Sequence, residues 1–102
     1  MAILKPGMRL RSQVDNTELI VIRAPDTEMD VRLGSHPVID IAAEPTHGLK
    51  LENRGEAALL GKRYGTSEGD LELLITKADR AALTLGDRPI EIRQSKPLPS
   101  SD

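Results

Sequence analysis

The sequence predicts an all-β fold: a small sandwich or barrel of about seven short antiparallel strands. The first observation behind this prediction is the alternation of apolar and polar residues, which repeats along most of the 102-residue chain. The second is the regular placement of turn residues, with eight glycines and seven prolines that separate the alternating segments. The third is the length, which suits a single domain, residues 1–102, with its own core.

The N-terminal region, residues 1–44, predicts a meander of strands. Residues 8–14 alternate between apolar and polar side chains, and residues 19–22 form a continuous apolar run rich in β-branched residues. Residues 29–33 alternate again, and residues 38–41 predict another short strand. Clusters of Asp, Asn, Pro and Gly lie between these segments, and such clusters are typical of tight turns.

The following region, residues 45–95, predicts a C-terminal β subdomain. Residues 49–52 alternate, and residues 71–76 have the composition of a strand. Residues 56–60 contain good helix formers but lie between two glycines, so they predict a single helical turn or an irregular crossover.

A hairpin is predicted at the end of this subdomain. Residues 82–85 and 88–92 flank Gly86, and glycine at the first turn position suits a type II′ loop. Pro89 fits an edge strand, where its missing N–H group costs no hydrogen bond. Residues 96–102 contain two prolines and no periodicity, so we expect an extended tail.

The segment from residue 10 to residue 38 has a particular order of turns and strands. Residues 12–15 form a first turn segment, a strand–turn–strand unit follows, and residues 32–34 form a second turn segment. This order and spacing resembles the rubredoxin-type, desulforedoxin-like metal ribbon. In that family a Cys-x-x-Cys knuckle and a Cys-Cys-Gly or Cys-Gly knuckle hold the metal.

The sequence departs from that family at the metal ligands. Ser12, Asp15, Arg32 and Leu33 stand where the resemblance requires thiolates, and Arg and Leu do not ligate metals. The resemblance therefore implies a ribbon that lacks its cysteine ligands, and aliphatic packing must hold the two turn segments together instead.

Composition excludes several classes of function. The absence of cysteine excludes a disulfide scaffold, a thiolate metal site and a cysteine nucleophile. One tyrosine is the only aromatic residue and the net charge is −2, so neither a base-stacking platform nor a basic nucleic-acid surface is expected. No apolar run approaches the roughly 20 residues that span a bilayer. We expect a cytoplasmic protein that binds neither nucleic acid nor membrane and uses no cofactor.

One short segment combines the residue types that bind ligands. Lys62, Arg63 and Tyr64 lie between two glycines, which allow a ligand or partner to approach the backbone closely. Arg63 could hold a carboxylate or phosphate, and Tyr64 offers a ring face and a hydroxyl group. The alternative is a strand in which Tyr64 fills the core. His36 completes the predicted ligand-binding residues.

Metal binding is not predicted from the residues. His36 and His47, with Glu44, could supply imidazole and carboxylate ligands, but their spacing matches no compact metal motif. Both histidines lie beside turn residues, which favours two solvated loop histidines.

Two functions from different classes follow. The first is a non-enzymatic β module, an accessory or interaction protein that binds a protein partner or a small anionic ligand. Exposed sheet edges also favour a homodimer. The alternative is a small β-barrel isomerase, lyase or cyclase without cofactor, in which Tyr64 acts as acid or base and Arg63 clamps an anion. A Tyr64 ring in the core with its hydroxyl bound to backbone favours the first function.

Overall fold

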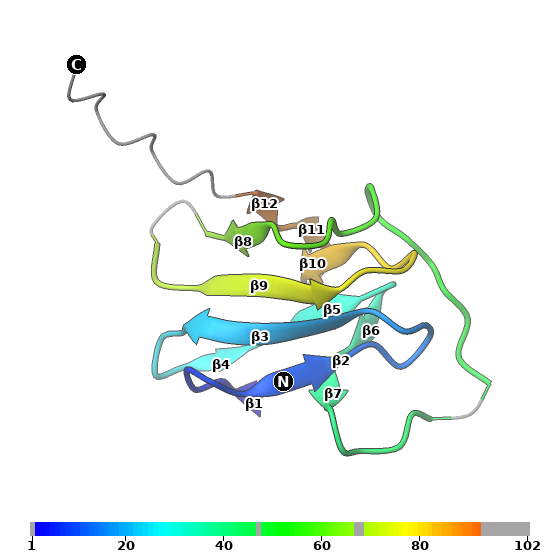
Figure 1. Cartoon of the computed structure of the whole chain (residues 1–102), viewed down its shortest axis with the longest axis horizontal. Coiled ribbons are helices and arrows are strands. Elements are labelled where there is room, and N and C mark those ends of the chain that lie inside the picture. Colours follow the sequence, from blue (N-terminus) through cyan, green and yellow to red (C-terminus); the bar gives the residue numbers. More distant parts are fainter. Residues whose placement is uncertain (1, 47, 67–68, 93–102) are drawn as a thin grey trace.

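The computed structural model describes residues 2–46, 48–66 and 69–92, and it confirms the all-β fold class (Figure 1). This part of the chain contains no helix, and therefore none that could cross a membrane. Its twelve strands outnumber the predicted seven because six of them are pieces of only two residues. The strands are β1 Ala2–Ile3, β2 Arg9–Arg11, β3 Glu18–Arg23, β4 Glu28–Met29, β5 Val31–Leu33, β6 His36–Pro37, β7 Ile39–Asp40, β8 Arg63–Gly65, β9 Glu72–Lys77, β10 Leu83–Leu85, β11 Arg88–Pro89 and β12 Glu91–Ile92.

The strands form two main antiparallel sheets. The larger has six strands in the order β12-β8-β9-β3-β2-β7, and the smaller has four in the order β11-β10-β5-β6. Strands β1 and β4 form a separate pair. Figure 1 shows the four-stranded sheet behind the six-stranded one, so the molecule is a small sandwich. The buried side chains, including Leu19, Leu33, Leu73 and Ile75, form its core.

The order of strands in the six-stranded sheet is symmetric about its centre. Strands β3 and β9 pair with Ile20 opposite Leu74, and each is flanked by one further strand, β2 or β8. Arg9 of β2 lies opposite Ile20, and Arg63 of β8 lies opposite Leu74. A shift of 54 residues maps Arg9 onto Arg63 and Ile20 onto Leu74, which gives the sheet an approximate two-fold axis.

Hydrogen bonds outside the ladders repeat with the same shift. The Gly7 N–H group donates to the Val21 carbonyl at 2.7 Å, and the Gly61 N–H group donates to the Ile75 carbonyl at 2.9 Å. Both glycines have positive φ, +90° for Gly7 and +75° for Gly61. The two parts of the chain, residues 3–41 and residues 57–92, are therefore two copies of one structural unit. We call them the N-terminal half and the C-terminal half.

The hairpins of the smaller sheet show this repeat in the sequence as well. Residues 33–38 read Leu-Gly-Ser-His-Pro-Val, and residues 85–90 read Leu-Gly-Asp-Arg-Pro-Ile. The Gly34 N–H group donates to the Ala82 carbonyl at 3.0 Å, and the Gly86 N–H group donates to the Asp30 carbonyl at 2.8 Å. In this part of the chain a shift of 52 residues relates the halves.

The halves share both main sheets, since β3 pairs with β9 and β5 pairs with β10. The predicted meander and C-terminal subdomain are thus joined by backbone hydrogen bonds along the middle of each sheet. The predicted tail, residues 96–102, lies outside the described residues.

Two predicted segments take other conformations. Residues 49–52 do not form a strand, because only isolated contacts hold them: the Glu52 N–H group donates to the Gly34 carbonyl at 3.0 Å. Residues 56–60 form the irregular crossover rather than the helical turn, and the Ala58 N–H group is bonded to the Ala81 carbonyl at 3.0 Å.

Candidate binding site around Tyr64

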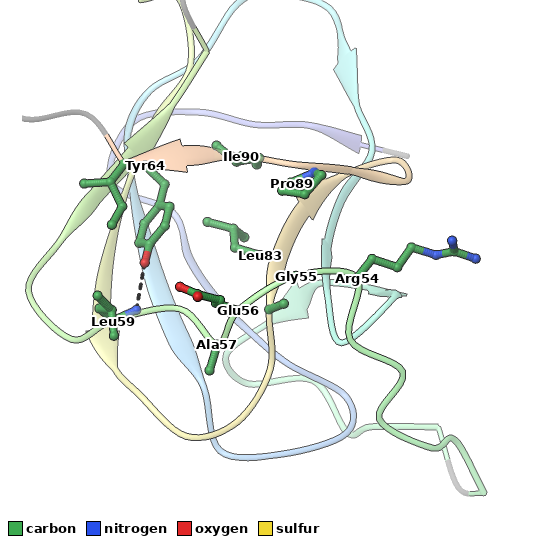
Figure 2. A pocket seen from close by; sticks show the side chains of 11 residues that line it. Arg54, Gly55, Glu56, Ala57, Leu59, Tyr64, Leu83, Pro89 and Ile90 are labelled. Atoms are coloured by element: carbon green, nitrogen blue, oxygen red, sulfur yellow. Dashed lines mark hydrogen bonds between the residues drawn. The ribbon is translucent and has the colours of Figure 1, made fainter.

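Tyr64 lies in β8 with its side chain in the core, and only 6% of the residue is exposed. Its hydroxyl oxygen accepts a hydrogen bond from the backbone N–H group of Leu59 at 2.8 Å. The side chain therefore faces inward and is bound to the crossover that precedes its own strand (Figure 2).

The two cations beside Tyr64 lie elsewhere. Arg63 is on the opposite face of β8, since successive side chains of a strand alternate, and its Nη1 atom lies 3.5 Å from Oε2 of Glu72. Lys62 is exposed just before the strand. The predicted arrangement of Arg63 and Tyr64 around one ligand is thus not formed.

His36 is also remote from Tyr64 in the fold. It lies in β6, at the opposite end of the four-stranded sheet from β11. Its Nε2 atom lies 2.8 Å from the Lys50 carbonyl and 4.0 Å from Oε2 of Glu52. Lys50 and Glu52 belong to the connection between the two halves, residues 42–56. The imidazole therefore attaches this connection to the edge of the smaller sheet. His47 lies outside the described residues.

A pocket opens beside Tyr64, between the crossover and the end of the last hairpin (Figure 2). We call it the C-terminal pocket; its volume is about 220 Å³. Its walls are mainly apolar and include Ala57, Leu59, Leu83, Ile90 and Ile92.

Two charged residues also line the C-terminal pocket. Figure 2 shows the Arg54 side chain extending away from the pocket, whereas the Glu56 carboxylate points toward the side where Tyr64 and Leu59 lie. A carboxylate is thus the charged group that the pocket presents.

The N-terminal half contains the equivalent pocket. This N-terminal pocket, of about 210 Å³, is lined by Leu10, Val31, Pro37 and Val38 among others. The 54- and 52-residue shifts map these positions onto Tyr64, Leu83, Pro89 and Ile90 of the C-terminal pocket. Sequence reasoning missed both pockets because it did not recognise the repeat. The paired Leu-Gly-x-x-Pro segments were the signal that could have revealed it.

The carboxylates of the two pockets differ in their partners. In the N-terminal pocket, Asp30 is bound by the Arg32 guanidinium at 3.0 Å, and Asp40 accepts a hydrogen bond from the Ala42 N–H group at 2.9 Å. In the C-terminal pocket, Glu56 forms neither an ion pair nor a hydrogen bond with any residue that the structure describes. The Glu56 side chain is exposed to solvent.

Large apolar side chains are exposed around the C-terminal pocket. Leu59 is 50% exposed, Leu60 is 63% exposed and Ile92 is 41% exposed. Leu59 and Ile92 line the pocket itself, and Leu60 follows directly in the chain. We call these three residues the apolar rim. The equivalent positions of the N-terminal half are polar or proline: Lys5, Pro6 and Asp40.

The hydroxyl group of Tyr64 has a counterpart in the other half. There the Lys5 N–H group, at the position equivalent to Leu59, donates to the sulfur of Met8 at 3.2 Å. Each half thus provides a side-chain acceptor for the equivalent backbone N–H group. The acceptor is a sulfur in the N-terminal half and a phenol oxygen in the C-terminal half. This equivalence indicates that the Tyr64 hydroxyl group supports the fold.

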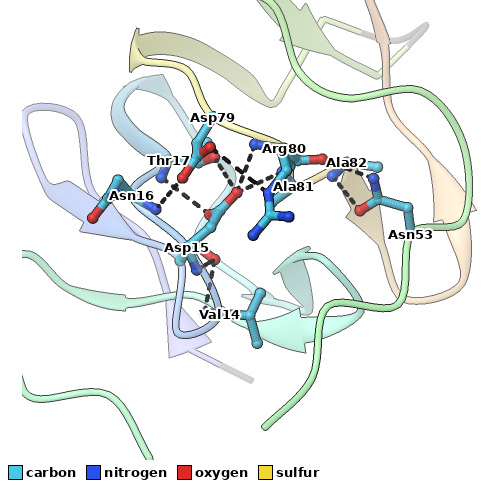
Figure 3. Close-up of polar contacts among 10 residues, drawn as sticks. Val14, Asp15, Asn16, Thr17, Asn53, Asp79, Arg80, Ala81 and Ala82 are labelled. Carbon is cyan, nitrogen blue, oxygen red and sulfur yellow. Dashed lines mark hydrogen bonds and ion pairs between the residues drawn. The ribbon is translucent and has the colours of Figure 1, made fainter.

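The first turn segment, residues 12–15, forms a polar network (Figure 3). The Ser12 hydroxyl oxygen accepts hydrogen bonds from the N–H groups of Val14 and Asp15 at 3.1 and 3.3 Å. The Asp15 carboxylate accepts hydrogen bonds from the backbone of Thr17, Arg80 and Ala81 at 3.1, 2.8 and 2.7 Å.

The network also sets the charge of Asp15. Partial burial raises the pKa of Asp15, but the hydrogen bonds from backbone N–H groups and from Ser12 outweigh it and hold the pKa below its ordinary value of 3.8. The carboxylate is therefore charged at neutral pH.

The second turn segment lies directly against the first. A Cβ atom at Gly34 would come within 2.7 Å of Val14 Cγ2 and 2.5 Å of Leu51 Cδ1. Aliphatic side chains therefore fill the space between the two turn segments. Within the described ranges no cluster of three or more His, Cys, Asp or Glu residues could hold a metal ion.

Comparisons of the chain with protein-family models, with curated proteins and with solved structures gave no match. The C-terminal pocket and the apolar rim are therefore the features from which a function is inferred.

Proposed function

We propose that this chain is a non-enzymatic interaction module, an accessory protein that binds a protein partner through the C-terminal pocket and the apolar rim. The observation that carries the proposal is the exposure of Leu59 and Ile92, which line one pocket, and of Leu60, which follows Leu59 in the chain. Single exposed apolar residues are ordinary, whereas a group of them around a hollow is typical of interaction sites.

The internal repeat strengthens this proposal. The N-terminal half makes the same backbone hydrogen bonds with Lys5, Pro6 and Asp40 at the three rim positions. The fold therefore does not need apolar side chains there. Contact with a partner gives them a role, because burying an exposed leucine contributes about 1.5–3 kcal/mol.

The positions of Tyr64 and Arg63 favour this function over the alternative of a cofactor-free enzyme. The Tyr64 hydroxyl is engaged by the Leu59 N–H group, and Arg63 lies on the other face of β8 beside Glu72. An acid–base tyrosine with an anion clamp needs both side chains at one ligand. The same separation favours a protein partner over a small anionic ligand.

The resemblance of residues 10–38 to a metal ribbon without its ligands stays a prediction. Val14 and Leu51 pack against Gly34, so apolar contacts join the two turn segments. We infer that residues 10–38 form a ribbon held by packing and by the Asp15 network.

The experiment is a quantitative pull-down from the native host with tagged chain, followed by mass spectrometry. The wild-type chain should recover a protein that the Leu60→Asp variant does not. Pro6→Asp is the matched control at the equivalent position of the N-terminal half, and it should recover the same protein as wild type. Equal recovery by wild type and both variants, or recovery of nothing but the chain, would refute the proposal. Light scattering of the purified chain tests the predicted homodimer.

A further inference from the structure

We propose that the C-terminal pocket receives a lysine side chain of the partner protein, with Glu56 as its counter-charge. This inference rests on the proposed function and adds the chemistry by which the partner is recognised. It is carried by three features of the part of the pocket that the structure describes: a carboxylate without a partner there, apolar walls, and an Arg54 side chain that extends away.

The carboxylate is the first feature. The N-terminal pocket supplies its own partners, since Arg32 binds Asp30 and a backbone N–H group binds Asp40. The 52-residue shift maps Arg32 onto Thr84, Asp30 onto Ala82 and Asp40 onto Ile92. The C-terminal half therefore has no ion pair at the positions of Arg32 and Asp30. Glu56 comes instead from the crossover and has no partner among the described residues. A cation from outside would complete this pocket as Arg32 completes the other.

The walls are the second feature. Leu59, Ile90 and Ile92 offer an apolar surface to the stem of a side chain, and the carboxylate lies on one side of it. Lysine has four methylene groups and a compact ammonium group at the end, so it buries its stem while its charge meets a single carboxylate. An arginine can also pair with one carboxylate, as Arg32 does with Asp30, so tighter binding of the same peptide with arginine in place of lysine would overturn the choice of lysine.

The local charge is the third feature. Arg54 is the one cation among the described residues that line the pocket, and Figure 2 shows its side chain extending away from it. An incoming ammonium group therefore meets the Glu56 carboxylate before it meets a positive charge.

The test compares two blocked tripeptides, acetyl-Leu-Lys-Leu-amide and acetyl-Leu-norleucine-Leu-amide. Norleucine keeps the stem of lysine and lacks the ammonium group. Both are titrated into the full isotope-labelled chain, and the amide resonances of Leu59, Ile90 and Ile92 are followed by NMR. We expect the lysine peptide to bind about tenfold more tightly, as expected for a charge-assisted hydrogen bond in a partly apolar site.

Two variants complete the test. Glu56→Gln should remove the preference for lysine over norleucine, whereas Glu44→Gln, an exposed carboxylate outside both pockets, should leave it unchanged. Equal affinity for the two peptides in the wild-type chain would overturn the inference, as would a preference that survives Glu56→Gln. n-Butylammonium chloride serves as a third probe, and affinity equal to that of the lysine peptide would indicate a free amine as ligand and also overturn it.

The outcome is distinguishable from failure of the proposed function. If Leu60→Asp abolishes capture of a host protein while the two tripeptides bind equally, the interaction module stands and the lysine recognition is wrong. If no rim variant alters capture, the interaction module itself is wrong.

Discussion

The Asp15 carboxylate and the Ala81 backbone join the two halves of the molecule. Asp15 follows β2 in the N-terminal half, and Ala81 precedes β10 in the C-terminal half. One carboxylate oxygen accepts the N–H groups of Ala81 and Arg80 at 2.7 and 2.8 Å (Figure 3). This contact has no equivalent in the other half, where the 54-residue shift places Gly69 at the position of Asp15.

Replacing Asp15 should destabilise the fold. In Asp15→Asn the amide group cannot accept from Thr17, Arg80 and Ala81 as the carboxylate does, so N–H groups lose their charged acceptor. The loss is expected to be about 1–3 kcal/mol in the free energy of unfolding, measured by urea denaturation. Asp26→Asn is the control, because Asp26 is exposed and makes no hydrogen bond or ion pair within the described part of the chain. Equal stability of the two variants would contradict the bridging role.

The pH dependence of stability should report the same carboxylate. Since the pKa of Asp15 is below 3.8 in the folded chain, the unfolded chain binds the proton more readily. The contribution of Asp15 is therefore fully present above its unfolded pKa and is lost as the pH falls through the lower, folded pKa. The stability difference between wild type and Asp15→Asn should be constant near neutral pH and shrink below about pH 4. Urea denaturation between pH 2 and pH 7 measures it, and a difference that grows in acid would contradict it.

Gly34 and Gly86 offer a matched pair at equivalent turns. Both have positive φ, +63° and +62°, so alanine meets backbone strain at each position, about 1–2 kcal/mol. A Cβ atom at Gly34 would also clash with Val14 and Leu51, whereas at Gly86 its nearest neighbour is 3.9 Å away. Gly34→Ala should therefore lose about 1–3 kcal/mol more than Gly86→Ala in thermal or urea unfolding. Equal losses would mean that the two turn segments are not packed as described.

The local pattern predicted the strands better than their partners. The apolar runs at residues 19–22 and 71–76 correspond to β3 and β9, and Gly86 has the positive φ that a type II′ loop requires at its first position. The pairing of β3 with β9 could not be read in the same way. This pairing joins residues more than fifty positions apart in the sequence. The repeat explains it, because equivalent strands of the two halves lie next to each other at the approximate two-fold axis.

The site was predicted in part for a similar reason. The glycines on either side of Lys62, Arg63 and Tyr64 predict a ligand-binding segment, and of these three residues Tyr64 lines the C-terminal pocket. Arg63 could be placed on the other face only once β8 was known to be a strand, because alternation separates neighbours in a strand. Glu56 gave no pattern at all, since the irregular crossover that carries it has no period from which a face can be predicted.

Tyr64→Phe tests whether the phenol serves the fold. Phenylalanine keeps the ring in the core but leaves the Leu59 N–H group without its acceptor. Because one net hydrogen bond contributes about 0.5–1.5 kcal/mol, the free energy of unfolding should fall by that amount while capture of the host protein is retained. The matched variant is Met8→Leu, which removes the sulfur acceptor of the Lys5 N–H group in the other half. Sulfur is a weaker acceptor than oxygen, so Met8→Leu should cost less.

The two variants together separate a supporting hydroxyl group from a functional one. A phenol that only satisfies a backbone N–H group affects stability, and its loss is comparable in kind to that of the Met8 sulfur. If the phenol acts on a ligand instead, Tyr64→Phe would leave stability nearly unchanged and would abolish binding. The repeat thus makes the N-terminal half an internal reference. Where both halves provide a side-chain acceptor for the equivalent backbone N–H group, that hydrogen bond belongs to the fold. What the C-terminal half adds, the apolar rim and Glu56, is then the part available for binding.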